Sequence, residues 1–246
     1  MEELLAQLLP FLEGNDIFTP QTFAMFWEGL VSTVYLVVLS AVVGVVLAVP
    51  LAMGRASRWR WLSGAIWVYT YVFRGTPLLI QLYIAYYGFA FIPGVRESPF
   101  AFFVDNPVWP ALLSFTLNTA AYTCELFLGA IRGTPRGEIE AARAYGMSRW
   151  LTYRRVILQG AFRRVLPAYA NEVIFLLHAS AIVSVVTIMD LTGAAYTVYA
   201  RFYSPFPPFL FAALLYMLLS FGIQGGFRRL ERRFNQHLQP AATGTG

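Results

Sequence analysis

Ionisable side chains within apolar runs are the residues of this 246-residue chain best placed to do chemistry. They are Arg74, Glu125, Glu172, His178 and Asp190. Burying charge in hydrocarbon is costly, so such residues usually face a bundle interior or a water-filled path. The sequence shows no nucleophile–base constellation, so we expect no catalytic residue. The chemistry indicated is charge compensation, either of a polar solute or between the residues themselves.

The fourth apolar run, residues 173–191, is expected to carry a polar stripe. At about 100° per residue on a continuous helix, five residues would share an arc of about 120°. They are Glu172, Ser180, Ser184, Thr187 and Asp190, with His178 on another face. Two interpretations stay open for Glu172 and Asp190, a solute path or a span end near water. The serines could simply bond helix to helix, and Glu125 could either neutralise Arg74 or contact a solute.

Composition places these residues in a bilayer. The chain is 58% hydrophobic and 13% charged, with a mean hydropathy of +0.57. We predict an all-α integral membrane protein, a single domain over residues 1–246 with five transmembrane helices. The predicted spans are residues 30–53, 61–92, 108–131, 173–191 and 206–225. Because Arg74, Gly75 and Pro77 interrupt the second, we expect one tilted helix kinked at Pro77.

Arginine counts predict one orientation. Three arginines lie in residues 54–60, eight in residues 132–168 and four in residues 228–233, whereas the opposite side holds only Arg96 and Arg201. Positively charged loops stay cytoplasmic. We therefore expect the N-terminus outside and the C-terminus in the cytoplasm. The acidic N-terminal residues lack the positive region of a cleavable signal peptide, so the first span is expected to remain.

Several kinds of site are excluded by residue counts. The chain has no lysine, and the Walker phosphate loop needs one. One cysteine, Cys124, excludes an internal disulfide, and two histidines are too few for a histidine-based metal cluster. We expect no cofactor and no metal on this chain, and no nucleic acid as a partner.

A charged segment, residues 134–167, separates the third and fourth spans, and we call it the elbow. Pro135 suits a helix start, Gly146 a stop and Ser148 a second start, so the sequence predicts a helix, a tight turn and a helix. An amphipathic helix resting on lipid headgroups is the alternative. The small residues Ala141 and Ala142 argue against it, because they would anchor poorly in lipid.

The elbow resembles the EAA loop of bacterial ABC importer permeases, through Glu140-Ala141-Ala142, Gly146 and Val156-Ile157-Leu158. Further matching stretches are 73–82 (FRGTPLLIQL), 118–125 (NTAAYTCE), 166–174 and 228–233. Together, over about residues 25–238, the chain is similar to polar amino-acid permeases, specifically M-type subunits of histidine/lysine/arginine/ornithine importers. Gln159 stands where the family usually has proline, which should leave the second elbow helix less sharply ended.

The resemblance implies a permease in the bacterial inner membrane, spanning it several times and assembled with other subunits. The implied partners are a second, Q-type permease, a dimer of ATP-binding subunits that carries ATP and Mg, a periplasmic or extracellular substrate-binding protein, and membrane lipid. The implied coupling residues are Glu140, Ala141, Ala142 and Gly146. For a cationic substrate the candidates are Glu172 and Glu125, then Ser180, His178 and Arg74.

Other classes of function fit less well. A permease for glutamine or glutamate is the alternative within the family. A secondary transporter usually has more spans and internal repeats, a membrane enzyme needs a catalytic constellation, and a channel needs a symmetric ring of filter residues. We expect this chain not to be an enzyme, since ATP hydrolysis would occur on a separate partner.

Overall fold

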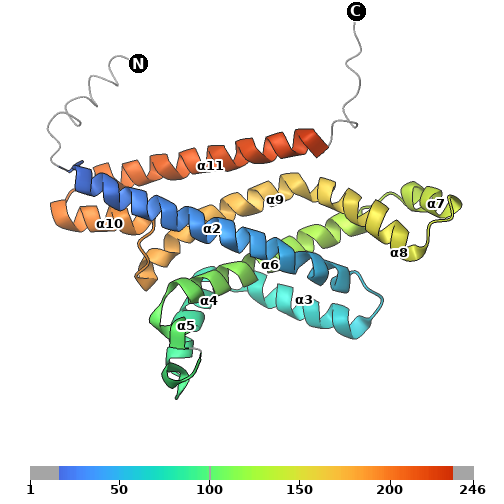
Figure 1. Ribbon diagram of the computed structural model, residues 1–246, viewed down its shortest axis with the longest axis horizontal. Coiled ribbons are helices and arrows are strands. Elements are labelled where there is room, and N and C mark those ends of the chain that lie inside the picture. Colours follow the sequence, from blue (N-terminus) through green and yellow to red (C-terminus); the bar gives the residue numbers. More distant parts are fainter. Residues whose placement is uncertain (1–16, 100, 235–246) are drawn as a thin grey trace, which may run out of the picture.

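A computed structural model describes residues 17–99 and 101–234, and within them the regular elements are helices (Figure 1). In order they are α2 (Pro20–Arg55), α3 (Arg60–Gly75), α4 (Leu78–Tyr83), the π-helix η1 (Ile84–Gly88), the 3-10 helix η2 (Val95–Glu97), α5 (Ala101–Asp105), α6 (Val108–Arg132), α7 (Arg136–Ala144), α8 (Arg149–Thr152), the π-helix η3 (Tyr153–Leu158), α9 (Gln159–Ala179), the 3-10 helix η4 (Ser180–Val186), α10 (Leu191–Phe202) and α11 (Phe206–Phe234). The predicted all-α class is confirmed.

The closest helix pair is α2 against α6, and small residues make it possible. On α2, Ser40, Gly44, Ala48 and Ala52 follow one another at intervals of four and are all buried. A Cβ added to Gly44 would collide with the Thr119 side chain of α6. Small residues at this spacing let two backbones approach without a hydrophobic driving force, which lipid does not supply. Helices α3, α9 and α10 pack against this pair.

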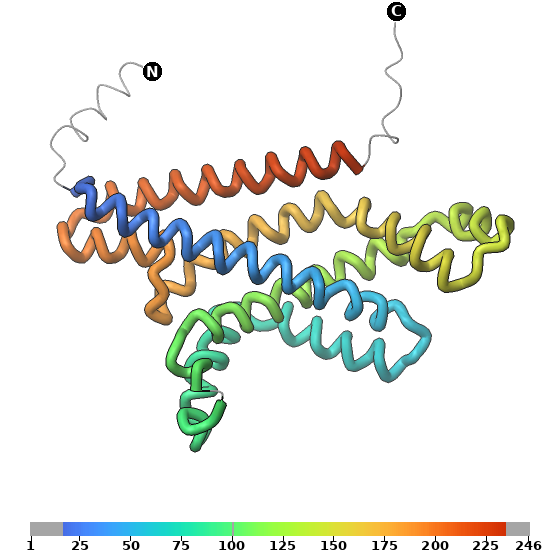
Figure 2. The backbone as a smooth tube through the Cα atoms, in the orientation of Figure 1, coloured from blue at the N-terminus to red at the C-terminus, as the bar shows by residue number. Residues whose placement is uncertain are grey.

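The second predicted span is two helices rather than one kinked helix, so that prediction is wrong. Helix α3 ends at Gly75, and Thr76 is extended at φ −114° and ψ 143°. Thr76 is extended because the ring of Pro77 leaves the residue before it little access to helical geometry. Pro77 is also extended and precedes α4. The chain then changes direction, so that α4 and α5 leave the line of α3 (Figures 1 and 2).

The fourth predicted span starts earlier and ends earlier than residues 173–191. One uninterrupted helical segment, Arg149–Val186, includes α8, η3, α9 and η4. It ends where Thr187 takes a left-handed conformation at φ 68°, which is unusual for a β-branched residue. Helix α10, which the sequence did not predict, follows this turn. Gly29 of α2 lies against the turn, since a Cβ there would stand 2.6 Å from the Asp190 carbonyl oxygen.

Length and composition alone identify three helices within the described residues that could cross a membrane. They are α2, the segment Arg149–Val186 and α11. Helix α6 has 25 residues, about 37 Å at ~1.5 Å each. It is not among the three, and polar residues such as Asn118 and Glu125 lie within it. The α2–α3 connection, the elbow and the end of α11 all lie toward one end of the molecule (Figure 1).

Candidate functional site

The break between α3 and α4 leaves backbone carbonyls without helical partners, and two side chains satisfy them. Gln81 Nε2 donates to the carbonyl oxygens of Phe73 at 2.8 Å and Thr76 at 3.1 Å. Asn118 Nδ2 of α6 donates to the Phe73 oxygen and to Gln81 Oε1, both at 3.1 Å. Non-helical backbone at membrane depth is tolerated only where it is satisfied by protein or lines a cavity. Side chains of the protein therefore stabilise the break between α3 and α4.

Arg74 occupies the last turn of α3, directly before this break. Its guanidinium carbon lies 5.2 Å from the ring centroid of Tyr122 on α6. The Tyr122 hydroxyl donates to the Arg74 carbonyl oxygen at 3.3 Å. A cation over an aromatic face is attracted by the ring quadrupole. Tyr122 thus holds both the backbone and the charge of Arg74.

Glu172 of α9 and Arg74 line the same cavity. Its volume is about 580 Å³, within the range of roughly 300–1,000 Å³ typical of small-molecule sites. Glu172 Oε1 accepts a hydrogen bond from Thr119 Oγ1 at 3.2 Å, which orients the carboxylate. The lining residues are Arg74, Gly75, Thr76, Pro77, Leu78, Asn118, Tyr122, Glu172, Phe175, Leu176 and Ala179. One cation and one anion therefore face a single hollow beside a helix break.

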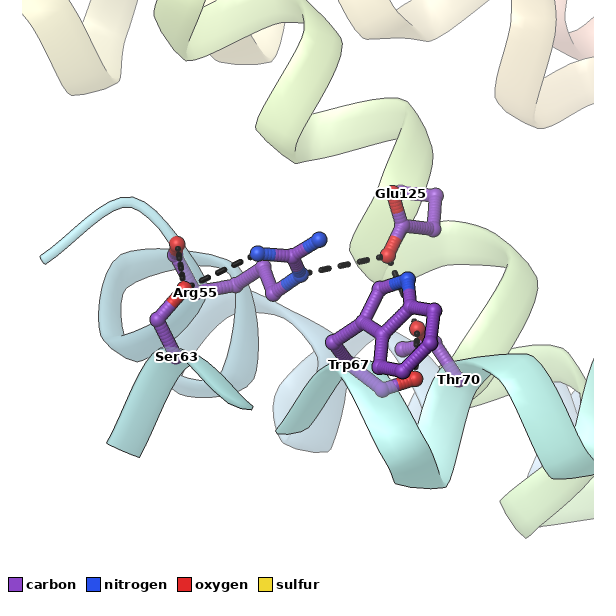
Figure 3. Close-up of polar contacts among 5 residues, drawn as sticks. All are labelled: Arg55, Ser63, Trp67, Thr70 and Glu125. Carbon is purple, nitrogen blue, oxygen red and sulfur yellow. Dashed lines mark hydrogen bonds and ion pairs between the residues drawn. The ribbon is translucent and has the colours of Figure 1, made fainter. Parts of the chain in front are cut away.

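Glu125 does not neutralise Arg74, so that alternative is wrong. Its Oε1 lies 3.7 Å from Nε of Arg55, at the end of α2, and accepts a hydrogen bond from Thr70 Oγ1 at 2.8 Å (Figure 3). Arg55 also donates to Ser63 Oγ at 2.9 Å. These contacts join α2, α3 and α6 at the arginine-rich end. Glu125 does not line the cavity, and its observed partners are structural.

Three other residues that the sequence singled out do not line this cavity. Ser180 is fully buried and donates to the Leu177 carbonyl oxygen at 2.7 Å. His178 Nε2 lies 3.2 Å from Ser220 Oγ of α11. Asp190 caps α10, with Oδ1 accepting from the Gly193 amide at 2.7 Å.

The predicted polar stripe is therefore wrong beyond Ala179. The stripe assumed a continuous α-helix, whereas η4 and the Thr187 turn change the angular register. Asp190 is also not exposed to water, because it is fully buried in the protein. Within the described residues, no group of three histidine, cysteine or acidic side chains could hold a metal ion.

The elbow has the predicted helix–turn–helix form. Helix α7 ends before Gly146, whose φ is 76°, and Ser148 Oγ caps α8 by accepting from the Leu151 amide at 3.3 Å. Gln159 stands where the family usually has proline, and the second elbow helix continues through it into α9, so this helix is not sharply ended. Of the proposed coupling residues, Glu140, Ala141 and Gly146 are exposed, whereas Ala142 is buried. Burial also raises the pKa of the Tyr153 phenol above its ordinary value, so this elbow side chain stays neutral.

Sequence reasoning missed residues that the structure places at the cavity or its break. They are Gln81, Asn118, Tyr122 and Phe175. All but Phe175 lie in the stretches that carry the family resemblance. The available signal was a polar amide inside an apolar run, at Gln81, close to the Gly75-Thr76-Pro77 break, and at Asn118 in the third predicted span. That pattern marks backbone groups that need side-chain partners in lipid.

A broken membrane helix that presents charges to a hollow is the arrangement of a transport protein. Residues 40–236 match the family described as "Binding-protein-dependent transport system inner membrane component". The chain belongs to this family. It is an inner membrane permease component of an ABC transport system rather than an enzyme, and the ATPase of such a system is a separate subunit.

Individual relatives are similar in sequence to this chain along most of its length. The histidine/lysine/arginine/ornithine transport system permease protein HisM of Escherichia coli K12 is 46% identical over 219 residues, which cover 88% of this chain and 92% of HisM. The octopine transport system permease protein OccM of Rhizobium meliloti is 40% identical over 87% of this chain and 86% of its own. The crystal structure of an amino acid ABC transporter with histidines superposes with a TM-score of 0.75 at 30% identity, covering 87% of this chain and 95% of that one.

Proposed function

We propose that this chain is the permease subunit of an ABC importer for basic amino acids such as arginine, lysine, histidine or ornithine. The observation that carries the proposal is the cavity between Arg74 and Glu172. An amino acid brings an α-carboxylate, which suits the planar fork of Arg74. A cationic side chain leaving water needs a countercharge, which Glu172 offers. The names of HisM and OccM, which specify basic amino acids and octopine, support this class of substrate.

The proposed arrangement has five spans, with the broken α3–α4 pair and α6 as the second and third. The N-terminus faces outward, and the elbow and C-terminus face the cytoplasm. The gathering of Arg55, Arg58 and Arg60, the elbow and the end of α11 at one end of the molecule supports this orientation. Reversing the orientation would place these arginines on the side that normally has few.

The proposed partners are a second, Q-type permease, two ATP-binding subunits and an extracellular or periplasmic binding protein. Glu140, Ala141 and Gly146 are exposed on the elbow and provide the surface on which an ATPase docks. Ala142, buried beneath them, holds the shape of that surface. ATP and Mg would bind to the partner, and this chain would bind only the transported solute.

Competition uptake by the assembled importer tests the substrate. Transport of labelled arginine is measured against an excess of unlabelled lysine, histidine, ornithine, glutamine or glutamate. We expect the basic amino acids to compete and the other two to have little effect. Equal competition by glutamine would show the alternative, an importer of polar neutral amino acids, and would remove Glu172 as a determinant of charge.

A further inference from the structure

Two adjoining hollows lie on the elbow side of α9, away from the substrate cavity. The first, of about 460 Å³, is lined by charged residues of α7, η3 and α9, including Arg155, Arg163 and Arg164. The second, of about 480 Å³, lies between α9 and the end of α11 and is lined mainly by Phe162, Leu166, Leu230 and Phe234. Gln159 and Arg163 border both hollows. A basic compartment thus continues directly into an apolar one.

The basic hollow carries uncompensated positive charge. Glu138 is the one carboxylate in its lining, against three guanidiniums. Arg164 is already engaged, since it donates to the Ala130 carbonyl oxygen at 3.1 Å and to Thr134 Oγ1 at 2.7 Å. In the part of the chain that the structure describes, Arg155 and Arg163 have no carboxylate within salt-bridge distance. Two guanidiniums are therefore free to bind an anion.

The helix places this charge at the depth of lipid headgroups. About 35 Å of continuous helix separates Arg163 from Val186, the last residue before the Thr187 turn, at ~1.5 Å per residue. The hydrocarbon core is about 30 Å thick. When Val186 lies at one face of the bilayer, Arg163 therefore lies just beyond the other. On the same scale Leu166, about 30 Å from Val186, lies at the edge of the acyl-chain region, and Phe162 lies at the depth of Arg163.

We propose that the paired hollows bind one anionic phospholipid, with its phosphate against Arg155 and Arg163. The part of one acyl chain nearest the headgroup would lie over Phe162, Leu166, Leu230 and Phe234 before the chain enters the hydrocarbon core. Phosphate suits arginine because the guanidinium can donate two parallel hydrogen bonds. Basic pockets beside apolar helix surfaces on the cytoplasmic side are typical lipid headgroup sites. A soluble partner chain would match the basic hollow, but the apolar hollow beside it matches an acyl chain.

The site has a structural consequence beyond the proposed transport function. Its basic half belongs to the elbow helices, and its apolar half includes the last turns of α11. A bound lipid therefore bridges the elbow and the C-terminal helix. The inference does not depend on which solute is transported or on the role of Glu172.

Native mass spectrometry of the assembled, detergent-solubilised importer tests the site. Phosphatidylglycerol and phosphatidylcholine with identical acyl chains are titrated in parallel. We expect phosphatidylglycerol to be retained preferentially, and Arg155→Gln or Arg163→Gln to weaken its binding about fivefold each. Arg154→Gln is the matched control, because Arg154 is the exposed neighbour of Arg155 and lines neither hollow. Each spectrum also reports whether the complex has assembled.

Several outcomes would overturn the assignment. Equal retention of the two lipids, or an equal effect of Arg154→Gln and Arg155→Gln, would show nonspecific binding. Displacement of the lipid by millimolar inorganic phosphate would show a simple anion site. Binding to this permease chain alone but not to the assembled importer would show that a partner subunit covers the hollows.

Discussion

Tyr122 lies under the Arg74 guanidinium, 5.2 Å from ring centroid to Arg74 Cζ, and donates its hydroxyl to the Arg74 carbonyl oxygen. The two residues come from different helices, α6 and α3, and both line the cavity that Glu172 borders. Tyr122 therefore positions the one cation that lines this cavity. Its ring contacts the Arg74 guanidinium, and its hydroxyl binds the Arg74 backbone.

Replacing Tyr122 should separate the two contributions. Tyr122→Phe keeps the ring and removes a single long hydrogen bond, so we expect nearly normal uptake. Tyr122→Leu removes the cation–π contact, worth about 0.5–2 kcal/mol, and should raise KM for arginine about 2- to 30-fold. Uptake kinetics, normalised to assembled complex, provide the measurement. Identical losses in both variants would show that the hydroxyl, not the ring, holds Arg74.

Glu172→Gln removes the anion of the cavity without changing its shape. An uncompensated buried charge costs several kcal/mol. We therefore expect arginine uptake to fall by about 100-fold, while neutral histidine loses much less because imidazole needs no full countercharge. Glu97→Gln in the exposed helix η2 makes the same chemical change away from the cavity and should have no effect on uptake. A uniform loss for both substrates would end the substrate-contact role and indicate a structural one.

Gln81→Met should damage the helix break itself. The methionine keeps the length of the side chain but removes the amide donor to the Thr76 carbonyl oxygen and leaves the Phe73 carbonyl oxygen with Asn118 alone. Each unsatisfied buried group costs about 1–3 kcal/mol. We expect less assembled complex and a lower melting temperature, measured by thermal challenge followed by size-exclusion chromatography. Wild-type stability would mean that Asn118 alone suffices to satisfy the break.

The Arg55–Glu125 pair should act on stability and not on substrate choice. Arg55→Gln and Glu125→Gln should each destabilise the complex, and the double variant should lose less than the sum, with a coupling of about 0.5–3 kcal/mol. Uptake ratios between arginine and histidine should stay constant in all three. A change in that ratio with Glu125→Gln would return this residue to the substrate path.

Elbow variants should distinguish docking from folding. Ala141 is exposed, so Ala141→Trp should hold an ATPase away and reduce uptake while the permease still inserts. Ala142 is buried, so Ala142→Trp should disrupt the packing of the elbow itself. ATPase activity, uptake and limited proteolysis of the elbow separate the two effects. Normal uptake with Ala141→Trp at normal membrane levels would place the docking surface elsewhere.

The sequence was sufficient to predict the elements whose signals are local. Gly146 and Ser148 specify the elbow turn through backbone conformation and capping, and both act as predicted. Arg74 and Glu172 were identified because charge is expensive in lipid, wherever the helices lie. The ends of helices could not be predicted where tertiary contacts decide them, as at the Thr187 turn, against which Gly29 packs.

The partners of individual charges could not be predicted from one sequence. Glu125 lies on the same helix as Tyr122, which contacts Arg74, yet it pairs with Arg55. That choice depends on how α3 crosses α6, and nothing local in the sequence encodes a crossing angle. The helix break was recognisable from Pro77. Whether the break bends the helix or ends it could not be predicted, because a kink and a full interruption begin with the same residues.

The uninterrupted helix from Arg149 to Val186 includes the second half of the elbow and Glu172. With the elbow as the docking surface, force from an ATPase would reach the cavity along a rigid lever, without a relay of side chains between helices. Pro167, inside α9, lies between the two ends and is a natural fulcrum. A tilt of about 5° there would move Arg149 by about 2 Å, since roughly 27 Å of helix separates the two residues. The direction of that movement at the elbow would fix the direction in which Glu172 moves against Arg74.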